Sequence, residues 1–181
     1  RVCAASRLFN RKGIDATSLE EIAAQVGATK RTLHRHLGSK QELVGACYDR
    51  AFKIFLHIKD AMLTCESTRL SAVTTAMHTL ALAYPREDLS PLLPLVGFDA
   101  LSVEAQQKFM QHFTELCQGY RETLRRGIEE GSIANVDVES RVLLLPGLLR
   151  WLVKDDVPTD EARRNDIAGE IAKLVAVGLR A

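Results

Sequence analysis

The sequence lacks any segment long and apolar enough to cross a membrane. Its longest apolar run, Leu143 to Leu149, contains Pro146 and falls far short of the roughly 20 residues that a spanning helix needs. Prolines are also few, 5 in 181 residues, while 46% of the residues are hydrophobic, which excludes a collagen-like or disordered chain. We therefore expect one folded domain of ordinary size or two small ones, with no membrane partner.

Cysteines are scarce and widely spaced. Cys3, Cys47, Cys65 and Cys117 form no C-x-x-C pair, so neither a zinc-binding spacing nor a disulfide framework is indicated. This pattern predicts a reducing, cytoplasmic location. The sequence begins inside the amphipathic pattern of the first helix. We therefore expect further residues before Arg1 in the natural protein.

Positive charge is concentrated at the start of the chain. Residues 1–62 contain 11 Lys and Arg against 6 Asp and Glu, whereas residues 63–181 contain 13 against 17. A basic first third joined to an acidic remainder suggests that one end of the molecule meets a polyanion. Charge alone does not decide this, because basic faces without a partner are common.

Apolar residues recur at helical spacing along nearly the whole chain, and no stretch alternates as a β-strand does. The sequence therefore predicts an all-α fold of about nine helices. Their expected ranges are 2–12, 19–26, 30–37, 40–63, 67–83, 89–99, 102–130, 137–154 and 159–180. We divide the chain into a small basic unit, residues 1–45, and a helical body, residues 46–181, joined by the long helix near 40–63.

The second and third expected helices are short and are linked by about three residues that include Gly27. The third has only Leu33 and Leu37 as apolar anchors, and its other positions are polar or basic. This combination is typical of a helix-turn-helix motif. A helix of about 10–12 Å diameter fits the major groove of DNA. A recognition helix must therefore pack on its own domain through one narrow apolar face and leave its remaining surface available to bases and phosphates.

Capping signals sharpen these helix boundaries. Thr17 and Ser18 each begin an S/T-x-x-E capping box, Thr29 can cap the third helix, and Ser39 with Glu42 opens the long helix. Helix N-terminal amides, together with a lysine at the start of the long helix, suit phosphate binding.

The run from Leu8 to Leu43 resembles the DNA-binding domain of the tetracycline-repressor (TetR) family. The residues that carry the resemblance are Leu8-Phe9, Lys12-Gly13, Ala16 to Ala23, Gly27 and Thr29 to Leu43. The family implies a homodimer with two recognition helices in successive major grooves of a near-palindromic operator. It also implies a C-terminal body that dimerises and binds a small effector.

The resemblance implies that Ser18 meets phosphate, that residues 30–32 face the bases, and that His34, His36 and Lys40 contact the backbone. The predicted DNA-binding residues are Ser18, Thr29, Lys30, Arg31, Thr32, His34, Arg35, His36 and Lys40. The chain departs from the family pattern in three places: His34 stands where tyrosine is usual, Arg31 where many members have a small residue, and Leu37 where phenylalanine is usual. The Arg31 side chain can contact either a guanine base or a backbone phosphate.

Catalytic and metal sites find little support. His34 and His36 are two apart on a helix and point in different directions, so we expect no metal. Cys117 and His112 are five apart, roughly 500° of helical rotation, which does not make a nucleophile and base pair. No G-x-S-x-G, H-E-x-x-H or P-loop pattern occurs, and we expect neither an enzyme nor a cofactor.

Apolar and aromatic residues of the body supply the remaining predictions. A mostly apolar pocket between the long helices would take an apolar effector. Its predicted residues are Phe55, Met77, His78, Phe98, Phe113, Cys117, Tyr120 and Trp151. The last two helices carry wide apolar faces that would form a four-helix interface between two chains. The predicted interface residues are Leu144, Leu148, Trp151, Ile171, Leu174 and Val175.

The sequence thus predicts a ligand-responsive transcriptional regulator, a repressor that binds a palindromic operator as a homodimer. The alternative is a helical ligand-binding or interaction module that does not read a DNA sequence. Operator sequence, effector identity and the direction of the effector's action are left open.

Overall fold

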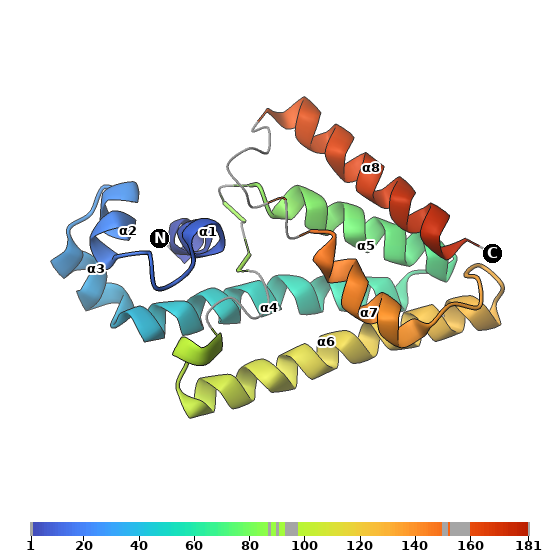
Figure 1. Cartoon of the computed structure of the whole chain (residues 1–181), viewed down its shortest axis with the longest axis horizontal. Helices are drawn as coiled ribbons and strands as arrows, with labels where there is room; N and C mark the ends of the chain where they lie inside the picture. Colours follow the sequence, from blue (N-terminus) through green and yellow to red (C-terminus); the bar gives the residue numbers. More distant parts are fainter. Residues whose placement is uncertain are drawn as a thin grey trace.

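The computed structural model describes residues 2–86, 88–89, 91–92, 98–149, 152 and 160–180. Within these ranges the chain forms eight α-helices and one short 3-10 helix, in agreement with the all-α prediction (Figure 1). The α-helices are α1 (Val2–Lys12), α2 (Leu19–Gln25), α3 (Lys30–Leu37), α4 (Lys40–Thr64), α5 (Arg69–Ala83), α6 (Val103–Glu129), α7 (Val138–Gly147) and α8 (Glu161–Leu179), and the 3-10 helix is η1 (Phe98–Ala100).

Two helix predictions differ from the structure. The helix expected over 89–99 lies partly outside the described residues, and its described part is not α-helical: Pro91 and Leu92 are irregular, and η1 follows at Phe98. Helix α7 ends at Gly147, directly after Pro146, rather than near residue 154. Pro146 has no amide hydrogen to donate to the Val142 carbonyl, which weakens the last turn of α7.

Side-chain caps fix where the helices of the N-terminal unit begin. The Ser18 hydroxyl accepts from the Glu21 amide, whereas the Thr17 hydroxyl donates to the Gly13 carbonyl at 2.8 Å and caps no helix. Ser39 and Glu42 form the complete capping box expected at the start of α4. Gly38, with a φ of 71°, makes the sharp turn between α3 and α4 that other residues adopt only under strain.

The three N-terminal helices sit at one end of α4, which continues unbroken into the body (Figure 1). Helix α1 packs across the first turns of α4. The side chains at this junction are almost completely buried, and they include Ala5, Phe9, Ile22, Leu43 and Val44. The N-terminal unit is therefore attached to α4 by a continuous apolar core.

The body is a bundle in which α6 runs along α4 and α8 lies along α5, with α7 packed on α6 (Figure 1). The residues after α6 contact both α6 and the end of α8. The Ile133 amide donates to the Gly127 carbonyl of α6 at 3.0 Å, and the Ala134 amide donates to the Leu179 carbonyl of α8 at 2.8 Å. No helix within the described ranges is long and apolar enough to span a bilayer.

Two glycines in helix interiors give opposite predictions for stability. A Cβ added to Gly127 would lie 2.4 Å from Ile133 Cδ1 and 3.0 Å from Arg69 Cβ, whereas one added to Gly45 would meet no described atom within 4 Å. We expect Gly127→Ala to lower the free energy of unfolding by about 1–3 kcal/mol through overpacking. Gly45→Ala should raise it by about 0.5–1 kcal/mol, because alanine loses less backbone entropy in a helix. Denaturant titration at one protein concentration measures both, and equal effects of the two substitutions would contradict this packing.

Candidate nucleic-acid interface and body cavity

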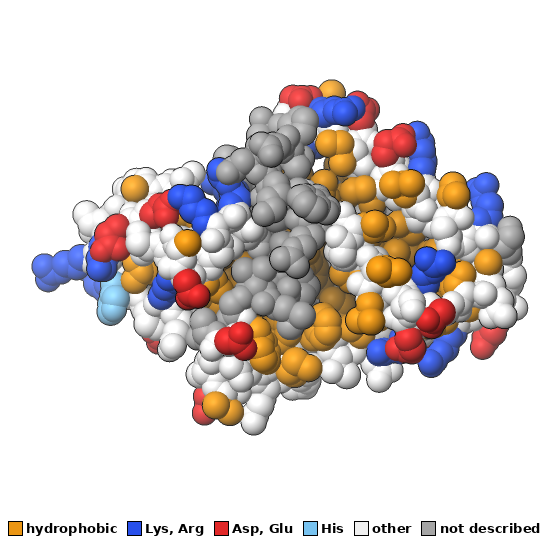
Figure 2. Space-filling model, in the orientation of Figure 1, with side chains coloured by type: hydrophobic (Ala, Val, Ile, Leu, Met, Phe, Trp, Pro, Cys, Tyr) orange, Lys and Arg blue, Asp and Glu red, His pale blue; other side chains and the backbone are white. Residues whose placement is uncertain are grey.

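Helix α3 lies at the extreme end of the molecule, away from the body. Lys30, Arg31, His34, Arg35 and His36 are all exposed there. Figure 2 shows Lys, Arg and His side chains gathered at the end formed by α2 and α3. The side chains of Leu33 and Leu37, the predicted anchors of this helix, lie outside the described part of the structure. The exposed face is therefore basic and has room to enter a groove.

The hydroxyl groups that cap α2 and α3 lie beside this basic face. Ser18 Oγ accepts from the Glu21 amide at 3.1 Å, and Thr29 Oγ1 accepts from the Thr32 amide at 3.2 Å. The Thr29 and Thr32 hydroxyls also lie 2.9 Å apart. A capping hydroxyl uses a lone pair, so its hydrogen remains able to donate to a phosphate oxygen.

Lys30 is held by an acidic neighbour on α2. Its Nζ lies 2.5 Å from Glu20 Oε1, and both side chains are more than half exposed. The hydrogen bond from Lys30, followed by one from the backbone, lowers the pKa of the Glu20 carboxyl below its ordinary value. An exposed ion pair contributes little net stability. Lys30 can therefore exchange Glu20 for another anion at small cost.

Lys40 bridges two parts of the N-terminal unit. It is the first residue of α4, and its Nζ donates to the Asp15 carbonyl at 3.3 Å. An ion pair between Lys12 and Glu21 joins α1 to α2 on the same unit. These contacts link the start of α4 to the loop between α1 and α2, and α1 to α2.

All the predicted DNA-binding residues thus come from one contiguous region: the N-cap of α2, the N-cap and body of α3, and the first residue of α4. Sequence reasoning missed the partner of Lys30, Glu20, because the two are ten residues apart on different helices and no local pattern pairs them. Within the described ranges, no group of three His, Cys, Asp or Glu side chains could hold a metal ion.

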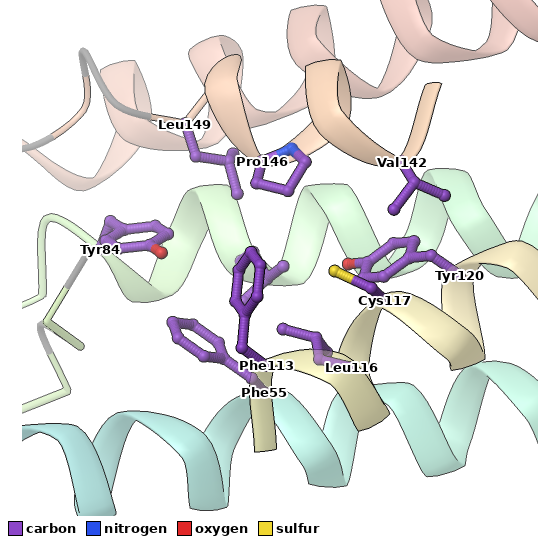
Figure 3. Close-up of a pocket in the computed structure, with 10 residues that line it drawn as sticks. Phe55, Tyr84, Phe113, Leu116, Cys117, Tyr120, Val142, Pro146 and Leu149 are labelled. Atoms are coloured by element: carbon purple, nitrogen blue, oxygen red, sulfur yellow. The ribbon is translucent and has the colours of Figure 1, made fainter. Parts of the chain in front are cut away.

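A second feature is a small apolar cavity in the body, between α4, α5, α6 and α7 (Figure 3). Its volume is about 30 Å³. That is room for only about two water molecules. The side chains that line it are Phe55, Leu80, Tyr84, Phe113, Leu116, Cys117, Tyr120, Val142, Pro146 and Leu149.

The ionisable groups of this cavity are held neutral. Burial raises the pKa of Tyr84, Tyr120 and Cys117 above their ordinary values, because a charged phenolate or thiolate is poorly solvated in an apolar interior. At neutral pH the cavity wall therefore carries no charge, and it favours an apolar group over an ionic one.

The sequence identified part of this cavity. Phe55, Phe113, Cys117 and Tyr120 line it as predicted. Met77, His78 and Phe98 are not among its lining residues: Met77 is fully buried in the core, His78 is half-buried on α5, and the Phe98 ring packs on Phe109 with centroids 5.1 Å apart. Trp151 lies outside the described residues.

Helices α7 and α8 carry an exposed apolar surface. Leu144 is 58% exposed and Leu174 64%, and Leu143, Leu148 and Val177 are also exposed. We call these five residues the α7–α8 apolar surface. Of the predicted interface residues, Leu144, Leu148 and Leu174 belong to it. Ile171 is half-buried and Trp151 lies outside the described residues.

One predicted interface residue was assigned to the wrong face of α8. Val175 is 3% exposed and belongs to the core of its own chain, since α8 packs along α5 on that side.

Comparison with known proteins agrees with this geometry. Residues 2–47 match the family model of bacterial regulatory proteins of the tetR family. The chain is 25% identical over 185 residues to the HTH-type transcriptional repressor KstR2 of Rhodococcus jostii, covering 97% of this chain and 87% of that protein. The crystal structure of the TetR-family transcriptional regulator PfmR from Thermus thermophilus matches with 27% identity and a TM-score of 0.76, over 100% of both chains.

A third similar structure is that of AibR in complex with isovaleryl coenzyme A and operator DNA. It is 19% identical with a TM-score of 0.73, over 96% of this chain and 94% of the other. The matched family consists of transcriptional regulators rather than enzymes, which confirms the non-enzymatic expectation. Residues 2–47 thus match the DNA-binding domain of the tetR family, and the whole chain, a helix-turn-helix unit followed by a helical body, has the fold of the TetR-family regulator PfmR.

Proposed function

We propose that the protein is a transcriptional repressor that binds a two-fold symmetric operator as a homodimer and leaves it when a small, largely apolar effector enters the body cavity. The observation that carries this proposal is the exposed basic face of α3, held at one end of the molecule by capped helix termini. The predicted cytoplasmic location follows from this function, because the operator lies on chromosomal DNA.

In this proposal the N-terminal half of α3 reads base edges. Lys30 and Arg31 lie in its first turn, where the side chains of a recognition helix reach the bases, and Thr32 follows them. Ser18, Thr29 and Lys40 flank α3 with donors suited to phosphates, which fix orientation without specifying sequence. Lys30 would exchange the Glu20 carboxylate for DNA on binding.

Dimer formation is supported by the α7–α8 apolar surface. Monomeric proteins rarely expose several large aliphatic side chains together, and such surfaces mark interaction sites. A surface that pairs with its own copy produces two-fold symmetry, which matches the symmetry of a palindromic operator. The occupant we propose is therefore a second copy of this chain.

The small cavity suggests how an effector acts. A ligand larger than two water molecules does not fit the cavity as it stands, so it must bind a state in which the surrounding helices have moved apart. A ligand shifts an equilibrium only through its different affinity for two states. If the compact state is the one that fits DNA, the effector favours release, which gives repression in its absence.

Acyl coenzyme A thioesters are the effector class we propose to test first. The cavity is apolar and uncharged, as an acyl chain requires. AibR, a protein of the same fold, has been crystallised with isovaleryl coenzyme A and operator DNA.

The first prediction concerns sequence reading. Selection from randomised duplexes with the purified protein should enrich one two-fold symmetric site. Lys30→Ala and Arg31→Ala should each reduce its preference over scrambled duplex by about 1–3 kcal/mol for each half-site. Lys40→Ala should weaken binding to both duplexes alike and reduce the salt slope by about 1.8, which is about 0.9 for each chain of the dimer.

Arg126→Ala, which removes an exposed charge near the far end of α6, is the matched control and should change nothing. Binding that is salt-sensitive but independent of sequence would favour the alternative, a module that does not read DNA.

The second prediction concerns assembly. Leu144→Glu combined with Leu174→Glu should convert the dimer to a monomer of 20.1 kDa in analytical ultracentrifugation, because two buried charges would face their copies across the interface. Val103→Glu introduces the same charge at a residue 65% exposed on α6 and should leave the dimer intact. A double variant that still sediments as a dimer would show that the interface lies elsewhere.

The third prediction concerns the effector. Acyl coenzyme A thioesters with short branched or linear chains should release the operator duplex in fluorescence anisotropy, whereas free coenzyme A should not. Cys117→Met, whose longer flexible side chain extends into the cavity, should weaken this response at least tenfold, while operator affinity without ligand stays within about twofold. The cavity assignment fails if the variant responds to the thioesters as the wild type does.

A further inference from the structure

A second hollow lies outside the body cavity, between the N-terminal halves of α4 and α6. Its volume is about 150 Å³, several times that of the body cavity. Its wall includes Gly45 and Phe52 of α4 and Ala105, Phe109 and His112 of α6. Its α4 residues lie in the first half of that helix, the half that adjoins the N-terminal unit.

Four of the nine residues that line this hollow carry a ring: Tyr48, Phe52, Phe109 and His112. The Phe52 and Phe109 rings meet edge to face with centroids 5.2 Å apart, and Tyr48 packs on Phe109 at 4.8 Å. The His112 ring lies 5.3 Å from that of Phe52. Aromatic rings arranged in this way favour a further ring inserted among them. A cavity of about 150 Å³ in an apolar interior is large enough to bind benzene.

Gly45 gives the hollow part of its space. A glycine inside a helix weakens it relative to alanine, and close packing explains such a residue at Gly119, where a Cβ would lie 2.4 Å from Lys59 Cγ. At Gly45 a Cβ would meet no described atom within 4 Å. Packing within the described chain therefore does not require glycine here, whereas an occupant of the hollow would benefit from the space.

One polar atom in the wall lacks a partner among the described residues. His112 Nδ1 is buried and makes no hydrogen bond to them. An unsatisfied buried polar atom is costly and rare in folded proteins. Nδ1 is covered rather than open to the hollow, so a ligand reaches it only when the imidazole ring turns. A ligand hydroxyl both donates and accepts, so it can then satisfy Nδ1 in either tautomer of the ring.

The charges around the hollow already neutralise each other. Lys108 Nζ lies 2.7 Å from Asp49 Oδ1, and both side chains are about half exposed. An anionic ligand would face Asp49 and a cationic one would face Lys108, and either would have to break this pair. The wall therefore favours an uncharged ligand.

We infer that this hollow is a second small-molecule site that takes a compact phenol: its ring lies against Phe52, Phe109 and Tyr48, and its hydroxyl bonds His112 Nδ1, which a turn of the imidazole ring exposes. This site is separate from the effector cavity of the proposed function, and its occupancy can be measured without DNA.

Isothermal titration calorimetry of the full chain with phenol, toluene and benzoate tests the site. We expect saturable binding of one phenol per chain, with toluene and benzoate at least tenfold weaker. His112→Phe should remove the preference for phenol over toluene. Ala105→Leu should abolish binding of both by filling the hollow, and it retains the backbone amide that Ser102 caps.

Cys117→Met, which occupies the other cavity, is the control and should leave phenol affinity unchanged. The inference is overturned if phenol does not bind, if benzoate binds as well as phenol, if His112→Phe keeps the full preference, or if Cys117→Met abolishes binding. Circular dichroism melting curves confirm that each variant is folded. If Ala105→Leu does not fold, the loss of phenol preference in His112→Phe alone tests whether phenol binds in this hollow.

Discussion

The apolar packing of α1 across the start of α4 is the interaction on which the rest of the molecule depends. Phe9, Leu43 and Val44 are fully buried in this junction. Burying each such side chain contributes about 1.5–3 kcal/mol. Because α4 runs without a break from Lys40 to Thr64, this packing makes the N-terminal unit and the first half of α4 one rigid piece. A movement of α4 in the body therefore moves the basic face of α3.

The segment after α5 adds a second connection to the same piece. The backbone carbonyls of Asp88 and Pro91 accept hydrogen bonds from side chains of α1 and α4: Arg50 Nη2 donates to Asp88 at 2.6 Å, and Asn10 Nδ2 donates to Pro91 at 2.9 Å. Helix α5, which lines the body cavity with Leu80, leads directly into this segment. Expansion of the cavity would thus act on the N-terminal unit through both α4 and the segment after α5.

Much of the N-terminal unit could be predicted because its signals are local. The Ser39–Glu42 box, the turn at Gly38 and the caps Ser18 and Thr29 each depend on residues three or four positions apart. They place the helix starts and, with them, the basic face of α3.

The body was less predictable because its sites depend on which helices meet. On α8, Leu174 and Val175 are adjacent apolar residues, and only the position of α5 decides that Val175 is buried and Leu174 exposed. Tyr84, Val142 and Leu149 line the cavity for the same reason: Tyr84 lies at the end of α5, and Val142 and Leu149 lie on and just after α7, so distant parts of the chain must meet. Helical periodicity identifies an apolar face but not its partner.

Methylation interference on the selected operator can show whether two copies of α3 enter successive major grooves. Dimethyl sulfate methylates guanine N7 in the major groove and adenine N3 in the minor groove. We predict interference from guanine N7 in two symmetric half-sites with centres about 34 Å, one helical turn, apart. Interference confined to adenine N3, or to a single half-site, would contradict it.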